Sequence, residues 1–313
     1  MLALMACREK AAPPVAPPAT PVPGRQVSAL RSDPACAAPF DASGAREKLR
    51  TPTGELKIGV LAGLKDADEE NAAFIRKLVA ELKRRGADVL IADGDLGDNP
   101  DEQETLLGAL AESGLPVLAL AGNREVRSEL DAVEAELRKK GSRIVDFSHT
   151  RIVELGDATV VGLPGAFERR QLHSEGACVY VQKDIEAVSA ALDRIPPPAI
   201  FVAAVPPRGQ DLRALDVSEG QNLGDPRLSH LLQKAQFGIF GQVWESGGRA
   251  IDRRGAPVPP KTESAQLYLN PGAADRTPWP MADGTTVAGQ AALLTVHGRK
   301  AAWEPVRLAE EKR

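Results

Sequence analysis

The fold is decided by the stretch VLIADGDLGDN at residues 89–99. It begins with a short apolar run, which predicts a buried strand, and continues into a loop of glycine and acidic residues. The same order of apolar run, loop and helical segment recurs on both sides of it. Strands are predicted at 57–61, 89–92 and 117–121, and helices at 71–85, 105–113 and 127–140. Repeated units of this kind build a parallel sheet, whose functional loops gather at the carboxyl ends of the strands.

The second half of the chain has a different pattern. Two apolar runs at 151–155 and 158–162 are separated by Gly156-Asp157, which predicts a hairpin. Further strands are predicted at 199–205, 237–241, 267–269 and 291–296, and helices at 183–194 and 226–234. A parallel first half followed by mixed strands predicts an α/β fold with two packed sheets flanked by helices. No repeat or second boundary divides residues 56–308, so we expect one domain there.

The sequence of residues 1–55 predicts a leader segment, a tether and an irregular segment that leads into the folded domain. Leu4-Met5-Ala6-Cys7 resembles the lipobox of a bacterial lipoprotein, in which Cys7 carries the lipid, although the basic start of a signal peptide is missing. Residues 11–24 contain six prolines, which favour an extended spacer. We therefore expect a lipid-anchored protein of the bacterial cell envelope, at the periplasmic or outer-membrane face. The alternative is an N-terminus that carries no lipid.

The composition limits the kinds of partner that we expect this protein to bind. The 313-residue chain has a formal net charge of −4, and its 39 lysines and arginines form no basic stripe. We expect no nucleic-acid partner, and contact with a membrane only through the N-terminal lipid. If Cys7 is lipidated, Cys36 and Cys178 remain, and an envelope compartment permits them to pair; two separate thiols are the alternative. Residues 309–313 form a short charged tail.

Short polar motifs follow the predicted strands in a fixed order. They are Gly94-Asp95-x-x-Asp98-Asn99, Gly122-Asn123-Arg124-Glu125, Pro206-Pro207, Gly241-Gln242-Val243-Trp244-Glu245 and Asn270-Pro271-Gly272. Each motif is weak alone, but their order and their placement after strands resemble the calcineurin-like metallophosphoesterases over residues 57–300. The resemblance implies the four-layer α/β/β/α sandwich of that family. It also implies a site where two divalent ions clamp a phosphate and activate a water.

Most of the residue types that such a metal site needs are replaced in this sequence. Where the resemblance implies metal ligands or a catalytic imidazole, the chain has Ala62, Leu64, Arg124, Ala204 or its neighbour, Gln242 and Trp244. Only Asp95, at the bridging position, and Asn123 remain. The four histidines, His149, His173, His230 and His297, have no ligand spacing to one another, so we expect them on the surface. Replacing even a residue that only hydrogen-bonds a metal ligand strongly lowers metal affinity. Replacement of the ligands themselves therefore predicts that no dinuclear centre forms.

Asp95 and Arg124 each have two interpretations. Asp95 is expected either to cap the helix after its loop or to keep weak binding of Mg²⁺ or Ca²⁺. Arg124 is expected either to pair with Asp95, because a buried carboxylate needs a partner, or to bind an anion together with Arg208 and loop amides.

The other polar residues of these loops have mainly structural interpretations. Asp98 and Asn99 suit a loop and a helix cap, and Asn123 suits a hydrogen bond within its own loop. Trp244 is expected to pack among the loops, with stacking on a ligand as the alternative.

Two functions remain open from the sequence. The first is a non-catalytic protein that binds a small anion or an envelope protein at the former active-site face, without a cofactor. Its ligand-binding residues are expected among Asp95, Asp98, Asn99, Asn123, Arg124, Arg208, Gln242 and Trp244. The second is a phosphomonoesterase or phosphodiesterase with a reduced site around Asp95, Asn123 and Gln242, which would need Mn, Fe, Zn or Mg.

Overall fold

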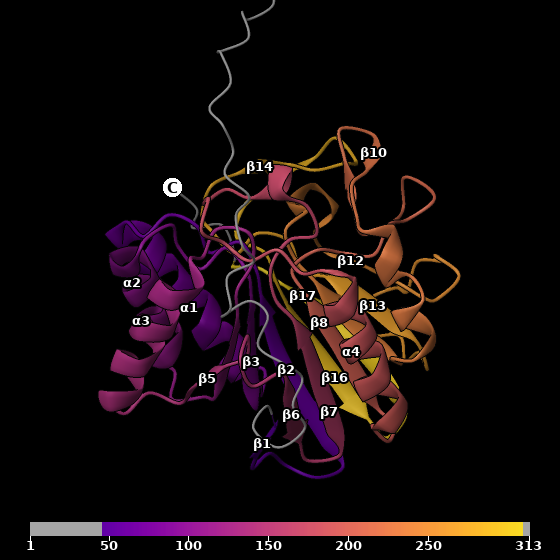
Figure 1. The fold of residues 1–313 in the computed structure, drawn as a ribbon, viewed down its shortest axis with the longest axis horizontal. Helices are drawn as coiled ribbons and strands as arrows, with labels where there is room; N and C mark the ends of the chain where they lie inside the picture. The colour runs from indigo at the N-terminus through magenta and orange to yellow at the C-terminus, as the bar shows by residue number, and fades with distance from the viewer. Residues whose placement is uncertain (1–45, 309–313) are drawn as a thin grey trace, which may run out of the picture. The chain divides into compact units, whose positions relative to one another are not determined.

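The computed structural model describes residues 46–308, in which two β-sheets are central (Figure 1). The strands of the first sheet are β2 (Glu55–Leu61), β3 (Val89–Asp93), β4 (Val117–Leu120), β5 (Ile144–Asp146), β16 (Ala291–His297) and β17 (Lys300–Val306). Their order is β17-β16-β2-β3-β4-β5. Neighbours from β2 to β5 are parallel, whereas β16 is antiparallel to β2 and to β17. The predicted parallel half is therefore present.

The second sheet has seven strands. They are β1 (Arg46–Leu49), β6 (Ile152–Leu155), β7 (Ala158–Leu163), β8 (Ala199–Ala203), β11 (Phe237–Phe240), β12 (Arg249–Ile251) and β13 (Leu267–Asn270). Their order is β1-β6-β7-β8-β11-β13-β12, with β7, β8, β11 and β13 parallel to their neighbours in that run. The predicted hairpin at Gly156-Asp157 joins β6 to β7 in antiparallel pairing.

Helices cover the outer faces of both sheets (Figure 1). On the first sheet they are α1 (Glu69–Arg84), α2 (Pro100–Ala111) and α3 (Arg127–Lys139), and on the second α4 (Gln182–Arg194). Ile75 and Leu82 of α1 are buried in one apolar cluster with Leu90 of β3. Ile185 of α4 is buried in another with Phe201 of β8. Each helix thus hides one apolar stripe against a sheet.

The two sheets pack against each other through their inner faces. Ile58 and Val60 of β2 belong to the same buried cluster as Val160 of β7 and Ile200 of β8. The layers run helix, sheet, sheet, helix, which confirms the predicted four-layer α/β/β/α sandwich. Among the described residues, no helix combines the length and the apolar character needed to cross a bilayer.

Some elements differ from the sequence predictions. Residues 46–49, assigned to an irregular lead-in, form edge strand β1, a short charged segment without an apolar pattern. α2 begins at Pro100, five residues earlier than predicted, because Asn99 caps it and proline suits the first helical turn. Residues 226–234 form no α-helix but two short 3₁₀ turns, η2 (Pro226–Leu228) and η3 (Leu231–Gln233). Their buried Leu228 and Leu231 lie three residues apart, which suits the 3₁₀ repeat.

Smaller elements had no periodic signal in the sequence. They are β9 (Val217–Ser218), β10 (Gln221–Asn222), β14 (Trp279–Pro280), β15 (Thr286–Val287), η1 (Arg169–Gln171) and η4 (Trp244–Ser246). The predictions for Cys7, Cys36, the proline-rich tether and the charged tail fall outside residues 46–308.

Candidate functional site

The loops after β2, β3 and β4 meet at one edge of the first sheet. Backbone hydrogen bonds join them: the Gly63 N–H donates to the Gly94 carbonyl over 3.3 Å, and the Lys65 N–H to that of Asp95 over 3.0 Å. Glycine permits this approach, because a Cβ on Gly122 would lie 3.0 Å from the Cα of Gly94. Asp95 has a left-handed backbone, with φ 57°, which is uncommon outside glycine. The motifs that begin at Gly94 and Gly122 therefore lie against each other.

Asp95 is buried and forms an ion pair. Its side chain is 3% exposed, and Nε of Arg124 lies 3.2 Å from its Oδ1. Nη1 of Arg124 also donates to Oδ1 of Asp98 over 2.6 Å. Nε2 of His173, on an otherwise exposed ring, lies 3.2 Å from the other oxygen of Asp98. The predicted pairing of Arg124 with Asp95 is confirmed, and it fixes the guanidinium between two carboxylates.

Two predictions for these loops are wrong. Asp95 does not cap α2: that role belongs to Asn99, whose side chain accepts from the Glu102 N–H over 3.1 Å, as was expected of Asn99. The bond from Asn123 does not stay within its own loop, because its Nδ2 donates to the Gln171 carbonyl over 2.6 Å. Asn123 instead ties the β4 loop to the segment around η1, a contact that sequence spacing does not show.

Lys65 brings a second positive charge to the same place. Its side chain is 5% exposed, and Nζ lies 3.9 Å from Oδ2 of Asp275. Nζ also lies 3.1 Å from the ring centroids of both Trp244 and Trp279. Burial lowers the pKa of Lys65 to about 8, although Asp275 and Asp95 oppose that shift. Trp244 therefore packs around a cation of the chain itself.

Buried carboxyl groups surround these two basic side chains. Burial raises the pKa of Asp93 well above its usual range and raises the pKa of Asp275 to about 6. It raises the pKa of Glu125 to about 8, even though the two oxygens of Glu125 accept from the backbone N–H groups of Leu96 and Gly122. The pKa of Asp95 is also raised by burial, against the opposing effect of Arg124. The centre is thus rich in acids and has few basic groups.

The residues present do not fit a dinuclear metal centre. Ala62, Leu64 and Ala204, where the resemblance implies ligands, are buried and apolar and offer no lone pairs. The amide of Asn123 is engaged with Gln171. The Asp95 carboxylate, which would bridge the ions, is already neutralised by a guanidinium. Transition-metal ions need several nitrogen, oxygen or sulfur ligands that converge on one point. Acids are numerous at this centre, but within residues 46–308 only Asp131, Glu134 and Asp146, which are not part of it, are grouped closely enough to hold an ion.

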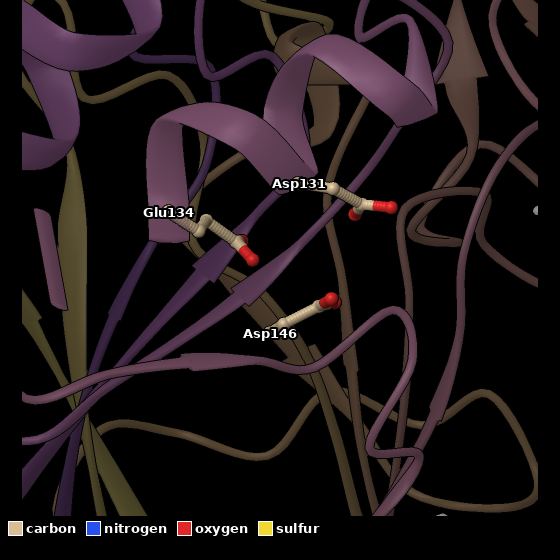
Figure 2. A group of neighbouring side chains, drawn as sticks. All are labelled: Asp131, Glu134 and Asp146. Atoms are coloured by element: carbon tan, nitrogen blue, oxygen red, sulfur yellow. The ribbon is translucent and has the colours of Figure 1, made fainter. Parts of the chain in front are cut away.

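A second acidic cluster joins α3 to the end of β5 (Figure 2). Asp131 and Glu134 extend from α3 toward Asp146 at the end of β5, with their carboxylate oxygens within 4.8 Å of one another. Nη2 of Arg127 lies 2.6 Å from both Asp131 and Asp146, so one guanidinium bridges two of the three acids. Burial raises the pKa of Glu134 well above its usual range. We interpret this cluster as structural.

Two neighbouring cavities open beside the centre. One of about 270 Å³ is lined by Gln242, Trp244 and Trp279 among others. The other, of about 680 Å³, is lined by residues that include Arg208. Gln171 and Leu223 line both cavities, so the two are adjacent. Arg208 and Arg124 thus lie in different environments. Arg208 lines the larger cavity, whereas Arg124 is paired with carboxylates at the centre.

Sequence reasoning missed Lys65, Asp275 and Trp279. The signal for Lys65 was present, since it follows the predicted strand at 57–61 directly after the apolar Leu64. Asp275 and Trp279 follow Asn270-Pro271-Gly272 without informative spacing, and they reach Lys65 only through the fold.

Cys178 is disulfide-bonded. Of the other two cysteines, Cys7 and Cys36, neither lies within residues 46–308, so the predicted pairing with Cys36 concerns a residue outside the described part.

No protein-family model matches the sequence, and no curated protein is similar to it in sequence. Solved structures do share its fold. A dimetal phosphatase from Danio rerio superposes with a TM-score of 0.53 at 14% identity, covering 80% of this chain and 98% of that chain. The protein TT1561 of Thermus thermophilus superposes with a TM-score of 0.51 at 17% identity, covering 80% of this chain and 99% of that chain.

A third similar structure is GAP50, the anchor in the inner membrane complex of Plasmodium. Its TM-score is 0.50 at 11% identity, with 78% of this chain and 82% of that chain covered. At these identities the likeness shows the fold alone. The chain has a mixed α/β fold of the metallophosphoesterase type.

Proposed function

We propose that this chain is a non-catalytic protein of the metallophosphoesterase-type fold, which binds a ligand or a partner at its former active-site face. The environment of Asp95 carries the proposal. Its carboxylate faces Arg124 at 3.2 Å, and Lys65 contributes a second favourable charge. In a hydrolase of this type, two divalent ions would supply that positive charge. Here side chains supply it.

Side-chain cations do not replace the chemistry of the ions. A divalent ion binds a water directly, lowers the pKa of that water and orients the phosphate. Arg124 stays protonated and acts only as a donor, and both of its carboxylate partners are on this chain. Nζ of Lys65 lies buried between two tryptophan rings and has no hydrogen-bond partner among the described residues. Neither group is placed to make a hydroxide nucleophile.

The fold itself is compatible with more than one role. The Danio rerio relative in fold is a dimetal phosphatase, whereas GAP50 is an anchor in a membrane complex. Because fold does not determine function, the side chains at the centre must decide. In this chain they favour binding over hydrolysis.

We also propose that the protein is anchored in the bacterial envelope through a lipid on Cys7. The Leu4–Cys7 lipobox resemblance and the six prolines of residues 11–24 support an anchor followed by a tether. The disulfide at Cys178 supports an oxidising compartment. With Cys7 lipidated, Cys36 is the partner that remains. Peptide mapping without reduction should find Cys36 linked to Cys178, and a Cys7–Cys178 link would contradict the proposal.

The experiment that tests the function is a hydrolysis assay. The full chain and its Asp95→Ala variant are incubated with nitrophenyl phosphate mono- and diesters, with Mn²⁺, Zn²⁺, Fe²⁺ or Mg²⁺ added. We expect no metal-dependent rate above that of Asp95→Ala. A metal-dependent rate that Asp95→Ala abolishes would establish the alternative, an active phosphoesterase with a reduced site.

A further inference from the structure

The charges of the former centre argue against an anion binding there. Arg124 faces the carboxylates of Asp95 and Asp98. Lys65 faces Asp275, with Asp95 also close enough to influence its pKa. Two basic groups therefore face three carboxylates, before the buried carboxyls of the neighbouring loops are counted. An incoming anion would find no surplus of positive charge, so an anion should bind elsewhere on this face.

The cavity of about 680 Å³ beside the centre has the opposite balance. Its charged lining consists of Arg170, Arg208 and Arg227 against Glu168 and Asp225, which leaves a surplus of one positive charge, three minus two. Apolar wall residues stand next to these charges: Phe167, Leu223 and Pro226. A basic cavity with apolar walls suits a ligand that has an anionic group and an apolar body.

Arg227 is a rigid part of this cavity. Its Nε and Nη2 donate to the buried carboxylate of Asp225 over 3.0 and 2.8 Å. Asp225 is itself fixed by the hydroxyl of Tyr180, which donates to it over 3.0 Å. The guanidinium carbon lies 6.0 Å from the ring centroid of Phe167 and 5.7 Å from that of Tyr180. Asp225 compensates the charge of Arg227, so Arg227 contributes a preorganised edge and no net charge.

Arg208 supplies the uncompensated charge. It is exposed, and its Nη2 donates to the Asn222 carbonyl over 2.9 Å, which holds the side chain in place. Within residues 46–308, Arg208 has no carboxylate partner. Arg170, at the rim, pairs with Glu168. Arg208 is therefore the side chain of this cavity that an external anion would satisfy.

We propose that the cavity between Arg208 and Arg227 binds a small organic oxyanion, a phosphate or carboxylate group carried on an apolar or ring-bearing body. The oxyanion contacts the guanidinium of Arg208, whose planar donors match either group. The body lies along Phe167 and Leu223, toward the smaller cavity in which Trp244 and Trp279 stand. This inference rests on the proposed function, because a ligand placed here is bound without being hydrolysed at Asp95.

Calorimetric titration of the full chain tests the site, with phenyl phosphate, benzoate and inorganic phosphate as probes at low salt. We expect phenyl phosphate or benzoate to bind more tightly than inorganic phosphate, and the pair of aryl probes tells whether phosphate or carboxylate is preferred. Arg208→Ala should weaken binding about 10-fold or more, because a charge-assisted hydrogen bond is lost. Arg208→Lys, which keeps the charge without the planar fork, should lie between.

The matched control is Arg299→Ala. Arg299 is an exposed arginine in the turn between β16 and β17 and lines none of the cavities described above. We expect its variant to bind as the wild type does. Absence of binding by both aryl probes, or equal weakening by Arg208→Ala and Arg299→Ala, would overturn the site.

Failure of the site and failure of the proposed function give different results. If the site is wrong, phenyl phosphate is neither bound nor consumed. If the proposed function is wrong, phenyl phosphate with added metal is converted to phenol and phosphate, and Asp95→Ala abolishes that conversion whatever residue stands at 208.

Discussion

The centre around Asp95 and Arg124 and the arginine cavity between Arg208 and Arg227 have opposite charge arrangements. At the centre, Arg124 and Lys65 are buried and face carboxylates of the same chain. In the cavity, Arg208 is exposed, and among the described residues its side chain bonds only the Asn222 carbonyl. The basic side chains of the centre are therefore paired within the chain, whereas the cavity has a positive charge that an external anion can pair with. A centre whose charges are compensated within the chain thus leaves the neighbouring cavity available for the proposed ligand.

The largest difference between the two regions should appear when the same substitution is made in each. Arg124→Ala leaves the buried Asp95 carboxylate without its guanidinium, and breaking such a pair should lower the free energy of unfolding by about 2–4 kcal/mol. Arg208→Ala removes an exposed side chain and should leave stability within about 0.5 kcal/mol of wild type. Urea denaturation measures both. Equal losses of stability in the two variants would contradict the difference in charge pairing between the centre and the cavity.

The acidic cluster of Figure 2 adds a pH test of a third group of buried charges. Burial raises the folded-state pKa of Glu134 well above its ordinary value of 4.5. The stability that it contributes is therefore fully present below pH 4.5 and is lost as the pH rises toward the folded-state pKa. Glu134→Gln should remove this loss, which amounts to at most about 1.4 kcal/mol per pH unit.

The control for this pH test is Glu136→Gln, on an exposed residue of the same helix. The free energy of unfolding is measured by denaturation at each pH from 4.5 to 8.5. Plotted against pH, it should have the same slope for wild type and Glu136→Gln and a flatter slope for Glu134→Gln. A wild-type stability that rises with pH relative to Glu134→Gln would show that the sign is wrong.

A smaller effect tests the contact between loops that builds the centre. A Cβ on Gly122 would lie 3.0 Å from the backbone of Gly94, so Gly122→Ala should cost about 1–3 kcal/mol of stability. Gly108, inside α2, has no atom within 4 Å of an added Cβ. Gly108→Ala should stabilise by about 0.5–1 kcal/mol through helix propensity. Thermal unfolding that ranks the two variants in the reverse order would contradict the loop packing.

Much of the fold followed from local patterns in the sequence. Apolar runs and helical spacing located β2, β3, β4, α1 and α3, because buried strands and amphipathic helices have distinct periods. Edge strand β1 was not predicted, because a short charged strand at the border of a sheet has no such period. Residues 226–234 have leucines three residues apart, a spacing that predicts an α-helix but equally suits the two 3₁₀ turns that form there.

The site was predictable only in part, for a similar reason. The pairing of Arg124 with Asp95 followed from chemistry, since a buried carboxylate needs a partner and both residues lie on neighbouring strand ends. The cage of Lys65, Trp244 and Trp279 joins residues up to 214 positions apart, and no local signal connects them. The charge balance that separates the centre from the cavity required the three-dimensional positions of all these groups.

If side-chain cations take the place of metal ions at this centre, the purified protein should bind almost no metal there. The purified full chain and its Asp95→Ala variant are dialysed with Mn²⁺ or Zn²⁺, freed of unbound ions by gel filtration, and measured by inductively coupled plasma mass spectrometry. We expect well under one ion per chain at this centre, and therefore the same metal content in both proteins. Two ions per chain in the wild type that are lost in Asp95→Ala would contradict it.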